Sequence, residues 1–128
     1  MTGKKLWTPA VELVDNSHLK NYQNWLEEKL GLSFSSYEEL WTWSVTDIES
    51  FWKSIWDYFG VKSYTPFKNI LSSNDMPGVK WFEGASISYA EHLLSKGEDN
   101  EVGIYFGNET DEITKISWKE LSSKVASL

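Results

Sequence analysis

Carboxylates are plentiful among the side chains with catalytic potential in this chain, and they include the adjacent pairs Glu27–Glu28 and Glu38–Glu39. Two carboxyl groups that flank a glycosidic bond can hydrolyse it, one of them as a general acid with a raised pKa. Neighbouring residues of a helix point in different directions, so neither pair can form such a site by itself. We therefore predict that both pairs lie on solvated helix faces.

The two histidines, His18 and His92, are candidate metal ligands or proton carriers. Neither lies in a metal-binding spacing such as H-x-x-x-H, and a metal site would need carboxylates gathered from elsewhere in the fold. We expect His18 to belong to a helix N-terminus and His92 to be an ordinary helix residue. The sequence contains no cysteine, which excludes thiolate catalysis, disulfides and cysteine-ligated zinc.

The glycines do not form a phosphate-binding pattern. Gly97, Gly103 and Gly107 match neither the G-x-x-x-x-G-K-[ST] loop nor the G-x-G-x-x-G turn. A G-x-S-x-G elbow is also absent from the sequence. We therefore assign no catalytic, cofactor-binding or metal-binding residue to this chain.

The charge balance restricts the partners that the chain can bind. The net charge is −7, and the basic residues are all lysine. Nucleic-acid phosphates demand clustered basic residues, so a nucleic-acid partner is not expected. Bidentate recognition of phosphate or carboxylate by arginine is also excluded, and only lysine or backbone N–H groups could take its place. Neither a membrane span nor a signal peptide is recognisable. We expect a cytoplasmic protein.

Helix starts are legible in the sequence because a hydroxyl residue precedes glutamate by three positions at several places. Such a capping box satisfies two backbone N–H groups at once. The four boxes are Ser36–Glu39, Thr46–Glu49, Ser88–Glu91 and Ser117–Glu120. A further helix is predicted from Ser17 or His18 to Leu30, ended by Gly31.

The second half of the chain changes character. Residues 61–85 contain prolines and glycines and are predicted to form an irregular crossing segment. A short helix at 89–94 follows. Residues 102–107 and 112–118 read as two strands of a hairpin, and residues 119–128 return to helix. Because a two-stranded hairpin is marginal alone, this part resembles the beginning of a larger α/β domain.

Aromatic residues gather in one stretch, "ELWTWSVTDIESFWKSIWDYFG" at residues 39–60. A ligand groove, a partner surface and a packed core would each explain them. Trp41, Trp43, Trp52 and Trp56 fall on predicted helices near core spacing, and large aromatics dominate both cores and interfaces. We favour a core or a domain interface over a small-ligand platform.

Three stretches carry a resemblance to a known family. They are "YEELWTWSVTDIESFWKSIWDYFGV" (37–61), "MPGVKWFEGASISYAEHLL" (76–94) and "ITKISWKELSSKVASL" (113–128), preceded by "KKLWTP" around Trp7 and Pro9. Together they resemble the start of acetoacetyl-CoA synthetases, which belong with acetyl-CoA synthetase among the adenylate-forming enzymes. The departures are Ser88 and Ile87, where relatives commonly have Asn and Leu.

The resemblance implies an enzyme that converts acetoacetate, ATP and CoA to acetoacetyl-CoA, AMP and pyrophosphate, with Mg²⁺. The phosphate loop, the ribose-binding Asp and the C-terminal lysine of such enzymes have no match in this sequence. The chain alone is therefore expected to be inactive and to bind none of ATP, Mg²⁺ and CoA. The resemblance also implies that Trp81 and Phe82 anchor the crossing segment to the helices.

The fold class predicted on these grounds is mainly α: a helical N-terminal cap, then a short β-hairpin and a helix that begin an adenylation-type α/β domain. We place the cap at 1–100 and the truncated adenylation domain at 101–128. The expected partner is the remainder of that domain, in the same chain or a separate one.

Two other interpretations stay open. One is a free-standing helical interaction module that binds a separate catalytic subunit or self-associates through bare strand edges. The other is an aromatic sugar-binding module, which would be rich in strands.

Overall fold

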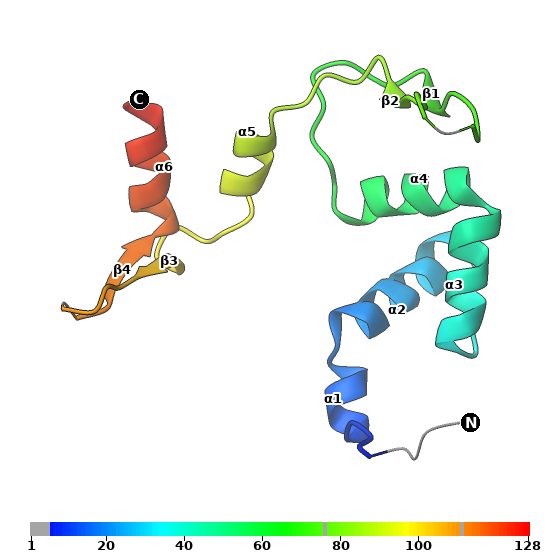
Figure 1. Cartoon of the computed structure of the whole chain (residues 1–128), viewed down its shortest axis with the longest axis horizontal. Helices are drawn as coiled ribbons and strands as arrows, with labels where there is room; N and C mark the ends of the chain where they lie inside the picture. Colours follow the sequence, from blue (N-terminus) through cyan, green and yellow to red (C-terminus); the bar gives the residue numbers. More distant parts are fainter. Residues whose placement is uncertain (1–5, 76, 111) are drawn as a thin grey trace. The chain divides into compact units, whose positions relative to one another are not determined.

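The computed structural model describes residues 6–75, 77–110 and 112–128 (Figure 1). Lys4 and Lys5 of the opening motif, together with Met76 and Asp111, lie outside the described residues. The elements in chain order are α1 (Val11–Asp15), α2 (His18–Leu30), α3 (Tyr37–Thr46), α4 (Ile48–Tyr58), β1 (Asn69–Leu71), β2 (Trp81–Glu83), α5 (Tyr89–Leu94), β3 (Val102–Phe106), β4 (Thr114–Ser117) and α6 (Trp118–Ala126).

The chain divides into two compact units. Unit 1 comprises the chain up to Gly60 together with Ile70–Trp81, and unit 2 comprises Val61–Asn69 and Phe82–Leu128. The described part is mainly helical with two small antiparallel sheets, as the predicted fold class requires. The strand-rich structure expected of a sugar-binding module is not found among the described residues.

Local capping explains where α2 begins and ends. The Ser17 hydroxyl accepts a hydrogen bond from the backbone N–H of Lys20 at 3.1 Å. Gly31 adopts φ 67°, a left-handed conformation that costs glycine little. This conformation lets the N–H groups of Gly31 and Leu32 bond to the carbonyls of Glu27 and Leu26. The predicted helix is confirmed.

The predicted cap at Thr46 is wrong. Thr46 is the last residue of α3, and its hydroxyl donates to the carbonyl of Thr42 at 2.8 Å. Asp47 caps α4 instead, accepting from the N–H of Ser50 at 3.2 Å. Asp is a stronger N-cap residue than Thr, so the helix starts one position later than the pattern indicated.

The other three boxes are half confirmed. Each serine hydroxyl accepts from the N–H of its glutamate, at 3.2 to 3.3 Å, in the pairs Ser36–Glu39, Ser88–Glu91 and Ser117–Glu120. The glutamate side chains bond elsewhere: to Ser35, Tyr64 and Lys124. Competing partners have therefore redirected the second bond of the box in each case.

The core of unit 1 is small and is centred on α2. Among the described residues, the buried apolar side chains are Tyr22, Leu26 and Leu40, and Leu26 has no exposed surface. Ser54 of α4 is also buried, with 1% of its surface exposed. Its hydroxyl donates to the carbonyl of Phe51 at 2.6 Å, so the proton between Tyr22 and Ser54, 2.6 Å apart, belongs to Tyr22.

A series of touching aromatic rings runs outward from this core. Phe34 contacts Trp43 at 5.3 Å between ring centres, Trp43 contacts Phe51 at 5.7 Å, and Trp52 contacts Trp81 at 5.4 Å. Phe51 and Trp52 are themselves 5.5 Å apart. Edge-to-face pairs of this kind add to the free energy of area burial. Trp81 is thus in contact with α4, as the resemblance implied for it, while the Phe82 ring contacts Phe67 of its own segment at 5.3 Å.

The segment 61–85 is more regular than the sequence indicated, because β1 pairs with β2. The N–H of Lys68 donates to the carbonyl of Glu83 in unit 2, and the N–H of Ser72 donates to the carbonyl of Lys80 in unit 1. Strands of three residues leave little periodicity to detect. The short helix α1 was missed as well, since Ala10 provides no capping side chain.

Unit 2 contains the predicted hairpin and final helix. Val102 lies opposite Ser117 and Ile104 opposite Ile116, so Gly103 is the extra residue of a bulge. The Trp118 ring lies over Gly103 of that bulge and packs still closer to Gly97. The N–H groups of Trp118 and Lys119 bond to the carbonyls of Glu101 and Asp99, which fixes the start of α6 on the preceding turn.

We expect Tyr22→Phe to lower the free energy of unfolding by about 1 kcal/mol at neutral pH, because it removes the bond to Ser54. Burial raises the pKa of Tyr22 above its ordinary 10.0, because it disfavours the charged phenolate. The stabilisation that comes from this raised pKa is therefore fully present below about pH 10, the pKa of tyrosine in the unfolded chain. It is lost as the pH rises through the pKa of Tyr22 in the folded chain.

Urea unfolding near neutral pH and at strongly alkaline pH, followed by tryptophan fluorescence, measures both effects. The variant should lose less stability than the parent on the alkaline side. Tyr89→Phe, at an exposed tyrosine, serves as the control. Equal alkaline losses in Tyr22→Phe and the parent would contradict the assignment.

We expect Gly97→Ala to destabilise unit 2 by about 1–3 kcal/mol, the usual range for overpacking. The added methyl group would lie 2.1 Å from Cδ1 of Trp118, closer than atoms can approach. Gly107→Ala is the matched control, because its methyl group would meet Ile113 Cγ1 at an ordinary 3.5 Å. Thermal unfolding followed by near-ultraviolet circular dichroism compares the two, and equal midpoints would refute the clash.

Candidate functional site

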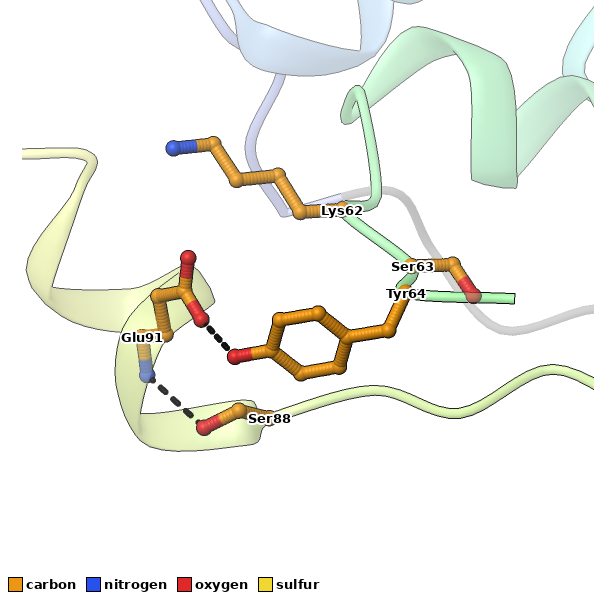
Figure 2. Close-up of a pocket in the computed structure, with 5 residues that line it drawn as sticks. All are labelled: Lys62, Ser63, Tyr64, Ser88 and Glu91. Atoms are coloured by element: carbon orange, nitrogen blue, oxygen red, sulfur yellow. Dashed lines mark hydrogen bonds between the residues drawn. The ribbon is translucent and has the colours of Figure 1, made fainter. Parts of the chain in front are cut away.

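A small pocket in unit 2 brings polar side chains together from two segments. Lys62, Ser63 and Tyr64 come from the segment after α4, and Ser88 and Glu91 come from the start of α5. Figure 2 shows the Tyr64 ring and the Glu91 carboxylate pointing toward one another across the pocket. The volume is about 140 Å³.

The Tyr64 hydroxyl donates a hydrogen bond to the Glu91 carboxylate. This bond and the negative charge of Glu91 raise the pKa of Tyr64 above its ordinary value, because both favour the protonated phenol. Ser88 is already engaged, since its hydroxyl caps α5. The pocket therefore has a proton held between two of its groups and a single cation, Lys62, at its margin.

Hydrogen bonds to backbone carbonyls hold the two sides of this pocket together. Tyr64 donates its N–H to the carbonyl of Ser86 at 2.8 Å, and the Thr65 hydroxyl donates to that of Gly84 at 2.7 Å. Ser63 adds a bond to the carbonyl of Ser86 at 3.1 Å. A volume below the roughly 300–1,000 Å³ of ligand pockets suits a structural joint better than a binding site.

The second candidate is an apolar groove in unit 1, formed by α2, α3, α4 and the residue after α4. It consists of two hollows of about 500 and 260 Å³ that share Leu19, Tyr22 and Ile55. The complete lining is His18, Leu19, Tyr22, Tyr37, Leu40, Trp41, Ser44, Phe51, Ile55, Tyr58 and Phe59. None of these is an acidic residue, a lysine or an arginine.

Several of the large apolar side chains that line the groove are exposed to solvent. Leu19, Trp41 and Tyr37 keep 44%, 55% and 65% of their surface exposed. Trp43 and Phe51, by contrast, pack against the buried core. The aromatic stretch thus divides between a core and an open surface, two of the alternatives that the sequence left open.

The residues singled out in the sequence do not assemble into a catalytic site. Glu27, Glu28 and Glu38 are exposed on α2 and α3, as predicted. Glu39 accepts from the Ser35 hydroxyl at 2.8 Å and its N–H at 2.7 Å, which holds the pKa of Glu39 below its ordinary value.

The histidines and glycines have structural surroundings. His18 is the first residue of α2, as expected, and lines the groove; His92 lies in α5. Gly97 and Gly103 contact Trp118. No group of three or more His, Asp or Glu within the described ranges is placed to hold a metal ion. Nor does any helix among these residues have the length and apolar character of a membrane span.

Sequence reasoning missed the Tyr64–Glu91 pair, because nothing local links residues 27 positions apart. The groove was partly within reach. Leu19, Tyr22, Leu26 and Leu30 recur at helical spacing, yet only Tyr22 and Leu26 are buried. Leu19 and Tyr22 of that stripe line the groove and Leu30 does not, so the stripe indicated an apolar face of α2 but not which part of it stays open.

Comparison with known proteins finds a family model that matches the middle of the chain. Residues 37–93, from the first residue of α3 to α5, match the acetyl-coenzyme A synthetase N-terminus. This part of the chain is therefore similar to an N-terminal segment of the acyl-CoA synthetase type.

More specific relatives cover nearly the whole chain. Acetoacetyl-CoA synthetases from Xenopus tropicalis and Rhizobium meliloti (strain 1021) are 30% and 29% identical, over 98% of this chain and 19% of theirs. A solved structure, acetoacetyl-CoA synthetase from Streptomyces lividans, matches with a TM-score of 0.89 and 33% identity, over 98% of this chain and 20% of that one.

The chain is similar, over nearly all of its length, to the N-terminal part of acetoacetyl-CoA synthetases. It spans about one fifth of the length of the relatives that it matches.

We expect Glu91→Gln to shift the titration of Tyr64 toward the ordinary tyrosine range. The amide oxygen still accepts a hydrogen bond, but the charge that favours the protonated phenol is gone. Ring ¹³C shifts of labelled tyrosines, followed against pH, resolve this residue. Glu98→Gln is the control, and a Tyr64 titration that is the same in Glu91→Gln and the parent would exclude the pairing.

Proposed function

We propose that this chain is the noncatalytic N-terminal cap of a ligase that converts acetoacetate, ATP and CoA to acetoacetyl-CoA, AMP and pyrophosphate. The observation that carries the proposal is the match to the Streptomyces lividans acetoacetyl-CoA synthetase, with a TM-score of 0.89 over 98% of this chain. The curated relatives from several organisms carry the same name. We also propose that the complete enzyme acts in the cytoplasm.

The proposed cap holds none of ATP, Mg²⁺ and CoA by itself. The residues of the described ranges do not fit these groups: the pocket beside Tyr64 is small and has one lysine, and the apolar groove has no charged lining. Phosphoryl chemistry depends on positioned cations and backbone donors around the phosphates. We assign these to the four fifths of the relatives' length that this chain does not span.

The partner in this proposal is the remainder of the adenylation domain, within one chain or as a separate one. The much greater length of the relatives supports it. Residues 101–128 would begin that domain, and the boundary at residue 100 stays a prediction.

A second candidate function is a free-standing module that binds a separate catalytic subunit or associates with itself. The open apolar groove favours it, as do Tyr105 and Phe106, which are 65% and 57% exposed on β3. Unpaired strand edges and apolar surfaces seek partners.

Grafting tests the first candidate directly. This chain replaces the matching fifth of the Streptomyces lividans synthetase, and acetoacetate-dependent release of pyrophosphate is measured. We expect an active chimera and, in calorimetry of the free chain, no binding of ATP–Mg²⁺, acetoacetate or CoA. Micromolar binding of any of these ligands by the free chain, or an inactive chimera, would count against the proposal.

A further inference from the structure

We propose that the apolar groove of unit 1 is the docking surface for the rest of the synthetase, and that its occupant presents an uncharged apolar surface to the groove. The inference deepens the proposed function and rests on it. It assigns one face of the chain, between α2, α3 and α4, to the contact with the partner.

The lining determines the surface that the occupant presents. Leu19, Ile55 and Trp41 present aliphatic and aromatic surface from three helices. A charged group placed over them would lose its water and find no counterion, which is costly. The parts of an interface that become fully buried are accordingly apolar and depleted in charge.

The net charge of the chain bears on whether a second copy could be the occupant. That charge is −7, and exposed glutamates of α3 and α4 line hollows other than the groove: Glu38 and Glu39 lie beside Trp43, and Glu49 lies beside Asp47. Complementary charge favours association, and like charge opposes it. A second copy of this chain would bring the same negative charge to the interface, which disfavours a symmetric dimer.

The length of the relatives identifies the source of the occupant. The Streptomyces lividans chain keeps this fold over 98% of our residues, while those residues are 20% of its own length. The same architecture therefore exists there beside a polypeptide about four times larger. A small ligand suits the groove less well, since ligand pockets add convergent polar groups, and the Tyr22 hydroxyl is occupied by Ser54.

Single-cysteine probes can test the surface, because the chain has no cysteine of its own. Leu19→Cys reports on the groove. Leu30→Cys is the matched control: it lies on the same helix, its parent leucine is 48% exposed against 44% for Leu19, and it does not line the groove. Maleimide labelling rates are measured by peptide mass spectrometry in the free chain and in the chimera with the Streptomyces lividans synthetase.

We expect both cysteines to react at similar rates in the free chain. In the chimera, the Leu19→Cys rate should fall by about tenfold or more while the Leu30→Cys rate stays nearly unchanged, because the centre of an interface excludes solvent. An exposed, reactive Leu19→Cys in the chimera would overturn the inference. If that chimera were active, the proposed cap function would stand without it.

The remaining outcomes are also decisive. A chimera that protects Leu19→Cys but has no activity would support the docking surface and count against the proposed function. Protection in the free chain that disappears on dilution would identify a second copy as the occupant. Protection of Leu19→Cys in the free chain at every concentration would mean that another segment of the same chain covers the groove. Either of these last two results would overturn the inference.

Discussion

The hydrogen bond from Tyr22 to Ser54 is the constraint on which unit 1 depends. It joins α2 to α4 across 32 positions of sequence, in a site where both residues are buried. A buried hydroxyl without a partner is costly, so the two helices cannot separate or slide without losing this pair. Leu26 fills the adjacent space completely, and the surrounding aromatic rings are held in turn against these few residues.

A core of this size cannot cover the apolar surface that the helices present. Three buried apolar residues among those described leave half-buried and exposed rings on each side, Trp41 and Tyr37 among them. In a domain that functioned alone, such surface would be a liability for aggregation. In a cap that packs against a larger domain, the same apolar surface can form the interface. The composition that first looked like an excess of aromatics is thus consistent with a chain whose core is completed by another polypeptide.

The sequence predicted the features that depend on neighbouring residues. Ser17 and Gly31 mark the ends of α2 through hydrogen bonds to residues within four positions. The β-branched and aromatic residues around 102–106 and 114–117 are enough for the strands to be recognised. It could not predict Tyr64 beside Glu91, or Phe82 at φ 45° with its ring on Phe67, because both depend on where a distant segment lies. Thr46 failed for a different reason: two adjacent residues could each cap a helix, and the stronger one, Asp47, does.

The Trp118 ring beside Gly97 and Gly103 has a consequence for how this family of sequences can diverge. Gly97 cannot acquire a side chain while the indole stays, because a Cβ there would lie 2.1 Å from the ring. At Gly103 the distance would be 3.1 Å, so the ring would have to move by a few tenths of an ångström. The indole cannot leave without opening a cavity beside a bulged strand. A lineage that replaces the tryptophan with a smaller residue therefore gains freedom mainly at Gly97, and a lineage that keeps the tryptophan keeps that glycine with it.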